Sequence, residues 1–198
     1  MKLYGSLTSP FVRKVRITLI EKGIVHEFVN VAASDPAVTT QNPLKAVPLL
    51  VRDDGEVFFD SPMLCEMIDS LPGRATLLPP VGEARWEALR WHALGHGIME
   101  AVITRLLEGR RSEACRDPAI YALHESRVQD ALAFAEARIG PGALVGGAFS
   151  LADIALGVAL EYIDLRYPHD WRGRFPRVAA WQAAVRERAS FVETRPVT

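Results

Sequence analysis

Two hydroxyl residues, Thr8 and Ser9, stand where a helix is expected to begin and could hold an anion there. They open the run 8–14, TSPFVRK, in which Ser9 suits the N-cap and Pro10 the first helical position. Because this helix follows a strand, its free N–H groups and positive dipole end would suit a thiolate. Disulfide oxidoreductases carry C-x-x-C at such a turn, whereas this chain has SPFV. A thiol would therefore have to come from a ligand.

A second motif, Val47-Pro48, opens a predicted strand and leaves backbone groups unpaired. Proline cannot donate a hydrogen bond to a neighbouring strand, and a cis peptide before it would turn the chain sharply. The backbone of Val47 would then be free to pair with an extended ligand. A peptide could bind there as an additional strand.

A third motif, Asp60-Ser61, begins a further predicted helix. The free N–H groups of a helix start and the serine hydroxyl suit a carboxylate, and the neighbouring aspartate suits an α-amino group. This pair would fit the zwitterionic end of an α-amino acid.

The elements that would position these motifs alternate between strand and helix in the first third of the chain. Residues 2–4 and 26–31 have strand patterns, with a helical stretch from 10 to 22 between them, which predicts a βαβ opening. Residues 47–59 contain the turn Asp-Asp-Gly between two apolar runs and predict a hairpin, so the sheet becomes antiparallel. A helix is expected from 61 to about 71.

Proline and glycine divide the chain into two predicted domains. The first covers residues 1–73, a linker covers 74–82, and residues 83–198 form an all-helical domain. Its predicted helices are residues 83–108, 118–138, 151–164 and 176 to about 188. The first of them carries apolar residues on more than one face, so we expect it to be buried on more than one side.

Composition excludes several classes of function. With 198 residues, 49% of them hydrophobic, and a net charge of -1, the chain has no general attraction for nucleic acid or anionic membranes. Arg13, Lys14 and Arg16 form a small basic cluster that is expected to be solvated, although Arg13 could pair across the domain boundary. The start lacks the apolar core of a secretory signal, and no apolar run could span a bilayer, so a cytoplasmic protein is expected.

Cysteine and histidine spacing predicts no metal site. Cys65 and Cys115 fit neither a disulfide framework nor a zinc motif, and both are expected to be small buried apolar residues. His92, His96 and Glu100 share one helix face, but no further cluster completes a set of ligands.

The three motifs together resemble the glutathione-site signatures of the glutathione S-transferase family, and of its small bacterial members in particular. They are TSPFVRK at 8–14, NPLKAVP at 42–48 and DSP at 60–62. Residues 149–155, FSLADIA, are similar to the family's buried capping box and hydrophobic staple, so the resemblance covers nearly the whole chain. It implies α/β plus all-α architecture: an N-terminal thioredoxin-like βαβ-ββα domain and a C-terminal helical bundle.

The resemblance also implies roles for individual residues. Asp60 and Ser61 would hold the γ-glutamyl group of glutathione, Val47 would pair with the cysteinyl part, and Ser9 would face the sulfur as the catalytic residue. Many members use tyrosine or cysteine for the sulfur, whereas Tyr4 here lies in the first predicted strand.

Two of these assignments stay open at the level of sequence. Thr8 is an alternative to Ser9 for activating the thiol. Lys45 and Gln41 are both candidates for binding the glycine carboxylate.

The activity implied by the family is transfer of the glutathione thiolate to a small, largely apolar electrophile, as in detoxification. Glutathione would be a cosubstrate bound between the domains, with no permanently bound cofactor, and the protein would be a homodimer. The apolar helix from residue 83 would supply a wall for the second substrate. The candidate wall residues are Trp91, Gly95, Met99 and Val102.

Other activities are compatible with the same fold. A glutathione-dependent reductase or dehalogenase would differ only in its acceptor. A non-enzymatic glutathione-binding interaction protein on the same fold is a further alternative. A non-enzymatic protein that binds other partners would be expected to lose the Asp60-Ser61 pair, and a self-contained disulfide oxidoreductase would need cysteine at position 9.

Overall fold

The computed structural model describes residues 1–166 and 169–196 of the chain and divides it into two compact units. The first unit comprises Met1–Pro80 and the C-terminal segment that begins at Arg188, and the second comprises Val81–Glu187. The break after Pro80 falls within the expected linker, 74–82. The segment from Arg188, which the sequence pattern grouped with the helical domain, packs with the first unit instead.

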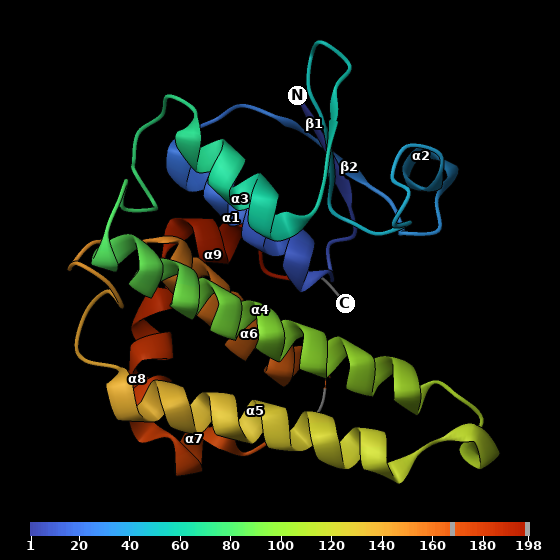
Figure 1. Ribbon diagram of the computed structural model, residues 1–198, viewed down its shortest axis with the longest axis vertical. Coiled ribbons are helices and arrows are strands. Elements are labelled where there is room, and N and C mark those ends of the chain that lie inside the picture. The colour runs from blue at the N-terminus through green and yellow to red at the C-terminus, as the bar shows by residue number, and fades with distance from the viewer. Residues whose placement is uncertain (167–168, 197–198) are drawn as a thin grey trace. The chain divides into compact units, whose positions relative to one another are not determined.

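The first unit is built on a four-stranded mixed sheet with strand order β2-β1-β3-β4 (Figure 1). Strand β1 (Lys2–Gly5) pairs in parallel with β2 (Glu27–Asn30) and antiparallel with β3 (Leu49–Val51). Strand β3 pairs antiparallel with β4 (Val57–Phe58). The predicted βαβ opening followed by a hairpin is confirmed, and with it the thioredoxin-like fold of this unit.

Helices α1 (Pro10–Lys22) and α3 (Ser61–Ser70) pack side by side in this unit (Figure 1). Their apolar residues form much of its core. The fully buried ones include Val12, Val15, Leu19, Leu64 and Ile68. A short helix that the sequence pattern missed, α2 (Pro36–Thr39), is capped by Asp35, whose Oδ1 accepts the N–H of Ala37 at 2.8 Å.

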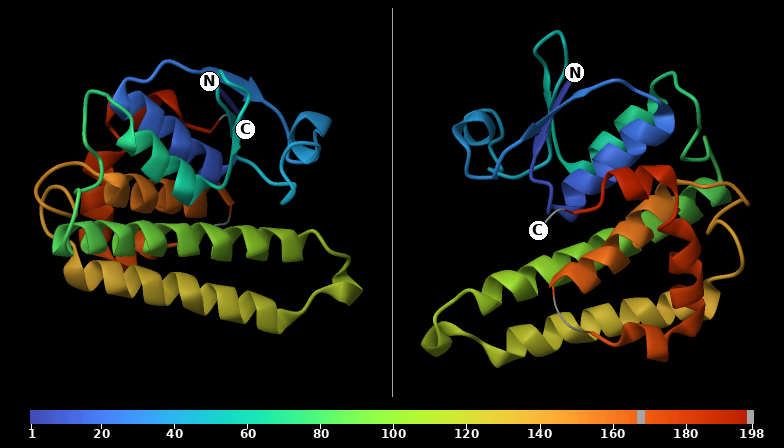
Figure 2. Two further views of the ribbon diagram at one scale, coloured as in Figure 1. Left: turned by 45° about the horizontal axis from the view of Figure 1, so that its top comes forward. Right: turned by 180° about the vertical axis from the view of Figure 1, so that it is seen from behind.

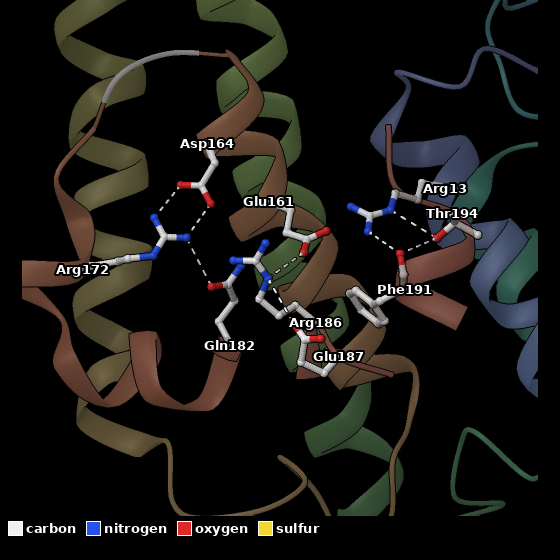
Figure 3. Close-up of polar contacts among 9 residues, drawn as sticks. All are labelled: Arg13, Glu161, Asp164, Arg172, Gln182, Arg186, Glu187, Phe191 and Thr194. Atoms are coloured by element: carbon white, nitrogen blue, oxygen red, sulfur yellow. Dashed lines mark hydrogen bonds and ion pairs between the residues drawn. The ribbon is translucent and has the colours of Figure 1, made fainter. Parts of the chain in front are cut away.

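The C-terminal segment is held to α1 by polar contacts. Arg13 is only 2% exposed, and its Nη2 donates to the carbonyl oxygen of Phe191 in α9 (Ala189–Glu193) at 3.1 Å (Figure 3). Glu21 accepts hydrogen bonds from Arg188 at 2.9 Å and from the Ser190 hydroxyl at 2.5 Å. These contacts explain why the segment joins the first unit.

The expected solvation of the basic cluster is wrong for two of its members. Besides Arg13, Lys14 is 0% exposed, whereas Arg16 is half-buried and lies over the Phe28 ring. Helix α1 contacts both α3 and α9, so little of its circumference faces solvent. The number of elements around a helix decides its exposure, and the charge pattern does not reveal that number.

The second unit is helical, as predicted (Figure 2). Its elements are α4 (Glu83–Gly109), the 3-10 turn η1 (Glu113–Cys115), α5 (Pro118–Arg138), α6 (Leu151–Arg166), α7 (Trp171–Arg174) and α8 (Pro176–Val185). Helix α6 is the most buried, since every residue from 151 to 160 lies in the core. The turn η1 and helix α7 were not expected from sequence, and α8 ends a few residues earlier than expected.

The start of α6 carries the predicted capping pair in a modified form. Oδ2 of Asp153 accepts both the N–H and the hydroxyl of Ser150 at 2.8 Å, and its Oδ1 accepts the N–H of Leu144 at 2.9 Å. The serine hydroxyl thus donates to the carboxylate, whereas a complete capping box would have it accept a backbone N–H. Burial raises the pKa of Asp153, and the hydrogen bonds from Leu144 and Ser150 act in the opposite direction.

Among the residues described, no helix combines the length and apolarity needed to cross a bilayer. Of the two cysteines, Cys65 is buried as expected, but Cys115 is exposed on the turn η1. The short turn between α4 and α5 offers no surface that could cover it.

Candidate functional site

The turn between β1 and α1 holds Ser9 at the start of the helix. Ser9 is the N-cap, with extended backbone angles, and its Oγ accepts the N–H of Val12 at 3.3 Å. A side chain at Gly5 would overlap Val12, so only glycine lets α1 begin this close to the strand. The local capping pattern predicted from sequence is therefore confirmed.

The hydroxyl groups of Ser9 and Thr8 differ in the hydrogen bonds that they already make. Because Ser9 uses its oxygen to accept the Val12 N–H, its own O–H remains able to donate. The hydroxyl of Thr8 lies 3.2 Å from that of Ser6, and the two share a hydrogen bond. Ser9 is thus better placed to donate to an anion.

The loop before β3 is held in shape by Asn42, the first residue of the motif NPLKAVP. Asn42 is 1% exposed, its Nδ2 donates to the carbonyl oxygen of Ala46 at 2.8 Å, and its Oδ1 accepts the N–H of Leu44 at 2.9 Å. Within this loop Lys45 has a positive φ of 50°. Asparagine followed by proline is a known turn signal, which could have identified this residue from sequence.

Val47 lies at the end of that loop, and the Val47–Pro48 peptide is cis. Pairing of β3 with β1 begins only at Leu49, opposite Tyr4. Within the described part of the chain, neither the N–H nor the carbonyl oxygen of Val47 takes part in a backbone hydrogen bond. Its backbone is therefore available to an extended ligand.

The two candidates for binding a carboxylate in this region differ in their contacts. The amide of Gln41 donates to the carbonyl oxygen of Ala37 at 2.6 Å. Lys45 is exposed, and across residues 1–166 and 169–196 its ammonium group makes neither a hydrogen bond nor an ion pair. The geometry favours Lys45.

Asp60 and Ser61 begin α3. Asp60 is the N-cap residue, its peptide with Phe59 is cis, and its exposed side chain makes no capping hydrogen bond. Ser61 is 1% exposed, and Pro62 follows it in the first turn. The carboxylate of Asp60 is therefore left for another partner, although aspartate at this position ordinarily caps its own helix.

Strand order brings the three loops together. Strand β1 runs toward the turn that carries Ser9, and the antiparallel β3 starts beside its end, where Leu49 lies opposite Tyr4. Strand β4 ends beside the start of β3, where Phe58 lies opposite Leu50 and leads to Asp60. The turn at Ser9, the loop at Val47 and the start of α3 therefore meet at one end of the sheet.

Two of the four candidate wall residues make close contacts within the second unit. Trp91 is 2% exposed and meets the Phe134 ring edge-on, with 5.9 Å between centroids. A Cβ at Gly95 would lie 2.5 Å from the carbonyl carbon of Ala155, so this glycine marks the closest approach of α4 to α6. Helix periodicity shows which residues are apolar but not which neighbour they face.

The remaining two wall residues are also buried. Met99 is fully buried, and Val102 lines a cavity at the C-terminal end of α4.

The three residues with possible metal-ligand spacing do not form a site. Nε2 of His96 lies 3.5 Å from Oε1 of Glu100, and His92 is buried. Over the part of the chain that is described, no group of three or more His, Cys, Asp or Glu side chains is placed to hold a metal ion.

These features define a protein with a thioredoxin-like unit, which carries the three loops, and a helical unit. Residues 3–76 match the family model described as glutathione S-transferase, N-terminal domain, and residues 118–184 match glutathione S-transferase, C-terminal domain. The chain is 34% identical over 199 residues to the uncharacterized GST-like protein YibF of Escherichia coli K12, covering 99% of this chain and 98% of that protein. The chain belongs to the glutathione S-transferase family.

Solved structures agree with this assignment. A glutathione S-transferase from Methylobacillus flagellatus, solved with glutathione bound, has a TM-score of 0.94 and 38% identity, covering 99% of each chain. A glutathione transferase family member from Pseudomonas fluorescens Pf-5, solved with S-(propanoic acid)-glutathione, has a TM-score of 0.87 and 31% identity over the full length of both chains.

Proposed function

We propose that this protein is a glutathione transferase whose glutathione site is the end of the sheet where the three loops meet. The observation that carries the proposal is that each loop leaves unsatisfied a group suited to one part of the tripeptide. Asp60 and Ser61 offer a carboxylate, a hydroxyl and a helix start to the γ-glutamyl end. Val47 offers backbone groups to the cysteinyl part, and Ser9 offers a hydroxyl to the sulfur.

The order of these groups matches an extended tripeptide. Neighbouring strands lie about 4.8 Å apart, so the loops at the ends of β1, β3 and β4 span roughly 10 Å, which is about the length of three extended residues at about 3.3 Å each. Lys45, in the Asn42 loop, would meet the glycine carboxylate at the other end from Asp60. The site is thus complementary in charge, with an acid for the α-amino group and a base for the carboxylate.

The chemical role of the site is to keep the thiol ionised. The Ser9 hydroxyl, with its oxygen engaged by Val12, would donate its proton to the thiolate. The N-terminus of α1 adds a positive potential at the same place. The thiolate is the nucleophile, and a small electrophile would receive it with loss of a leaving group or by addition to a polarised double bond.

The similar proteins support this proposal. The M. flagellatus protein was solved with glutathione, and the P. fluorescens protein with a thioether of glutathione, which is the kind of product that such a transfer would form.

The first turn of α4 also supports the proposal of a homodimer. Trp86 in this turn is 63% exposed, and Val81, just before the helix, is 78% exposed. A second copy of the chain would cover these apolar side chains. Light scattering at micromolar concentration should give twice the mass of the chain, and Trp86→Glu should shift it toward the monomer. A monomeric mass for the parent protein would overturn the dimer.

Calorimetry with glutathione tests the main proposal. The Asp60→Ala variant should bind glutathione roughly ten- to a hundredfold more weakly, because one charge-assisted hydrogen bond is worth about 1.5–3 kcal/mol. Glu56→Gln removes an exposed carboxylate from the hairpin turn and serves as the matched control.

A second measurement tests the reaction itself. The parent protein, supplied with glutathione and a panel of aryl halides and unsaturated carbonyl compounds, should form thioethers that mass spectrometry detects. Absence of glutathione binding in the parent would overturn the site, and binding without any thioether would overturn the transferase activity.

A further inference from the structure

A cavity of about 260 Å³ lies within the second unit, at the end of α4, the start of α5 and the end of α6. Its lining residues are Val102, Arg105, Leu106, Gly109, Arg110, Tyr121 and Arg166. Pockets for drug-sized ligands measure about 300–1,000 Å³, so this one suits a smaller molecule. Every lining residue belongs to the second unit, so the cavity can be considered apart from the glutathione site.

The lining of the cavity is positively charged, since three of its seven residues are arginines and none is acidic. Arg105 is already balanced: its Nη1 donates to Oε2 of Glu125 at 2.9 Å. Glu125 is held in turn by Gln129 at 2.8 Å and by His169 at 3.0 Å. This network fixes Arg105 in the wall of the cavity and accounts for its charge.

Two acids on the helices that border the cavity, Glu108 of α4 and Asp164 of α6, bind other groups. Glu108 accepts from Arg111 at 3.2 Å and from the Asp117 N–H at 2.7 Å. Asp164 is bound by Arg172 at 2.6 Å, and Figure 3 shows this pair.

Arg110 has no acidic partner within ion-pair distance in the part of the chain that the structure describes, so its positive charge at the cavity is not balanced there. It is exposed, and among the residues described its guanidinium group has neither a hydrogen bond nor an ion pair. A ligand anion could supply the missing charge.

The third arginine of the lining, Arg166, lies over the Tyr162 ring at 5.1 Å. The other lining residues are mainly apolar. Val102 and Leu106 contribute aliphatic surface, and Arg105 lies over the Tyr121 ring at 5.4 Å. A Cβ at Gly109 would stand 2.8 Å from the Tyr121 hydroxyl, so glycine at this position allows the phenol to close one side of the cavity. A ligand that fits must combine an apolar body with a negative charge.

We propose that this cavity binds a small organic carboxylate with an apolar aliphatic or aromatic body. The guanidinium of Arg110 would receive the carboxylate, for which its planar fork of donors is well matched. The body would lie against Val102, Leu106 and the Tyr121 ring. The proposal rests on the second unit alone and does not depend on the glutathione site.

The test compares 3-phenylpropanoate with its neutral counterpart, 3-phenylpropanamide, by calorimetry on the full chain. The carboxylate should bind and the amide should bind at least tenfold more weakly. Arg110→Gln should weaken binding of the carboxylate about two- to fivefold, a modest loss because Arg110 is exposed, and should leave amide binding unchanged. Arg127→Gln, an exposed arginine of α5 outside the cavity lining, is the matched control.

A second variant tests the apolar part of the cavity. Leu106→Trp should fill the cavity and lower affinity for the carboxylate at least tenfold, and an unchanged cooperative unfolding transition would show that the fold persists. Equal binding of acid and amide, or an Arg110→Gln variant that binds like the parent, would overturn the proposal. Inorganic phosphate binding as tightly as phenylpropanoate would also overturn it, in favour of a site for any anion.

Discussion

Nε of Arg13 donates to Oγ1 of Thr194 across 3.3 Å, although 181 positions separate the two residues in the chain. The same guanidinium donates to the Phe191 carbonyl oxygen and lies 5.4 Å from the centre of the Phe191 ring. One buried side chain of α1 thus binds the C-terminal segment by two hydrogen bonds and a ring contact (Figure 3).

Removing the Arg13 guanidinium should therefore weaken the attachment of the C-terminal segment to α1. Arg13→Met keeps most of the apolar stem but removes the hydrogen bonds donated to two buried acceptors, which should lower the free energy of unfolding by about 1–3 kcal/mol. Urea unfolding measures that loss, and limited proteolysis should cut the variant first near residue 188. Arg127→Met, at an exposed position, should unfold like the parent; an equal effect in both variants would contradict the role of Arg13.

Ser9→Ala should raise the pKa of bound glutathione. A free thiol has a pKa of about 8.5, and a hydrogen bond to its anion worth roughly 1.5–3 kcal/mol would lower that pKa by about one to two units. Losing the hydroxyl should reverse this shift while affinity changes only a few-fold. Thiolate absorbance measured against pH reports the pKa, with Thr8→Val as the control. Identical titrations of parent and Ser9→Ala would make Ser9 a helix cap only.

Lys45 and Gln41 can be separated by the ligand they recognise. Lys45→Met should weaken glutathione binding up to about fivefold, as expected for an exposed ion pair, and Gln41→Met should have a smaller effect. With γ-glutamylcysteine, which lacks the glycine carboxylate, both variants should bind like the parent. Calorimetry with the two ligands makes the comparison. A loss at Lys45 that persists with γ-glutamylcysteine would place that lysine elsewhere.

Asp153 should make stability depend on pH. Since burial raises its pKa in the folded state, its stabilising contribution is complete below the unfolded value of about 3.9 and is lost as pH rises through the folded value. Asp153→Asn should lower the free energy of unfolding by about 1–3 kcal/mol, because an amide replaces the carboxylate that accepts hydrogen bonds from Ser150 and Leu144.

The difference in unfolding free energy between the parent and Asp153→Asn should therefore be larger near pH 4 than near pH 7. Glutathione affinity per folded molecule should not change. A difference that grows with pH would show that the carboxylate is stabilised in the fold, contrary to the effect of burial.

The two thiols should differ in reactivity. Cys65 is buried, and burial raises its pKa against the opposing effects of the Lys14 charge and the hydrogen bond from Thr18. Cys115 is exposed on η1. A disulfide reagent should therefore titrate one thiol in the native protein and both in denaturant, and none quickly in native Cys115→Ser. Rapid reaction of that variant would contradict the burial of Cys65.

The sequence by itself determined the features that depend on residues a few positions apart. Ser9 before Pro10 predicted the cap that the structure contains, because an N-cap bond joins a residue to the N–H three positions on. The hairpin around residues 53–55 and the long helices followed from turn residues and periodicity in the same way. The candidate glutathione residues came from short motifs, whose members are close in the chain.

Only the tertiary structure decided which surfaces meet. The sequence made Gly95 a candidate wall residue, and only the fold showed that it lies against the backbone of Ala155. The charge of Arg13 is typical of a surface residue, but in the fold this side chain is buried against α9. How deeply a residue is buried depends on its contacts with elements distant in sequence, and no local sequence pattern reveals those contacts. For the same reason, only the fold showed that Glu108 and Asp164 bind other groups and that Arg110 lines a cavity.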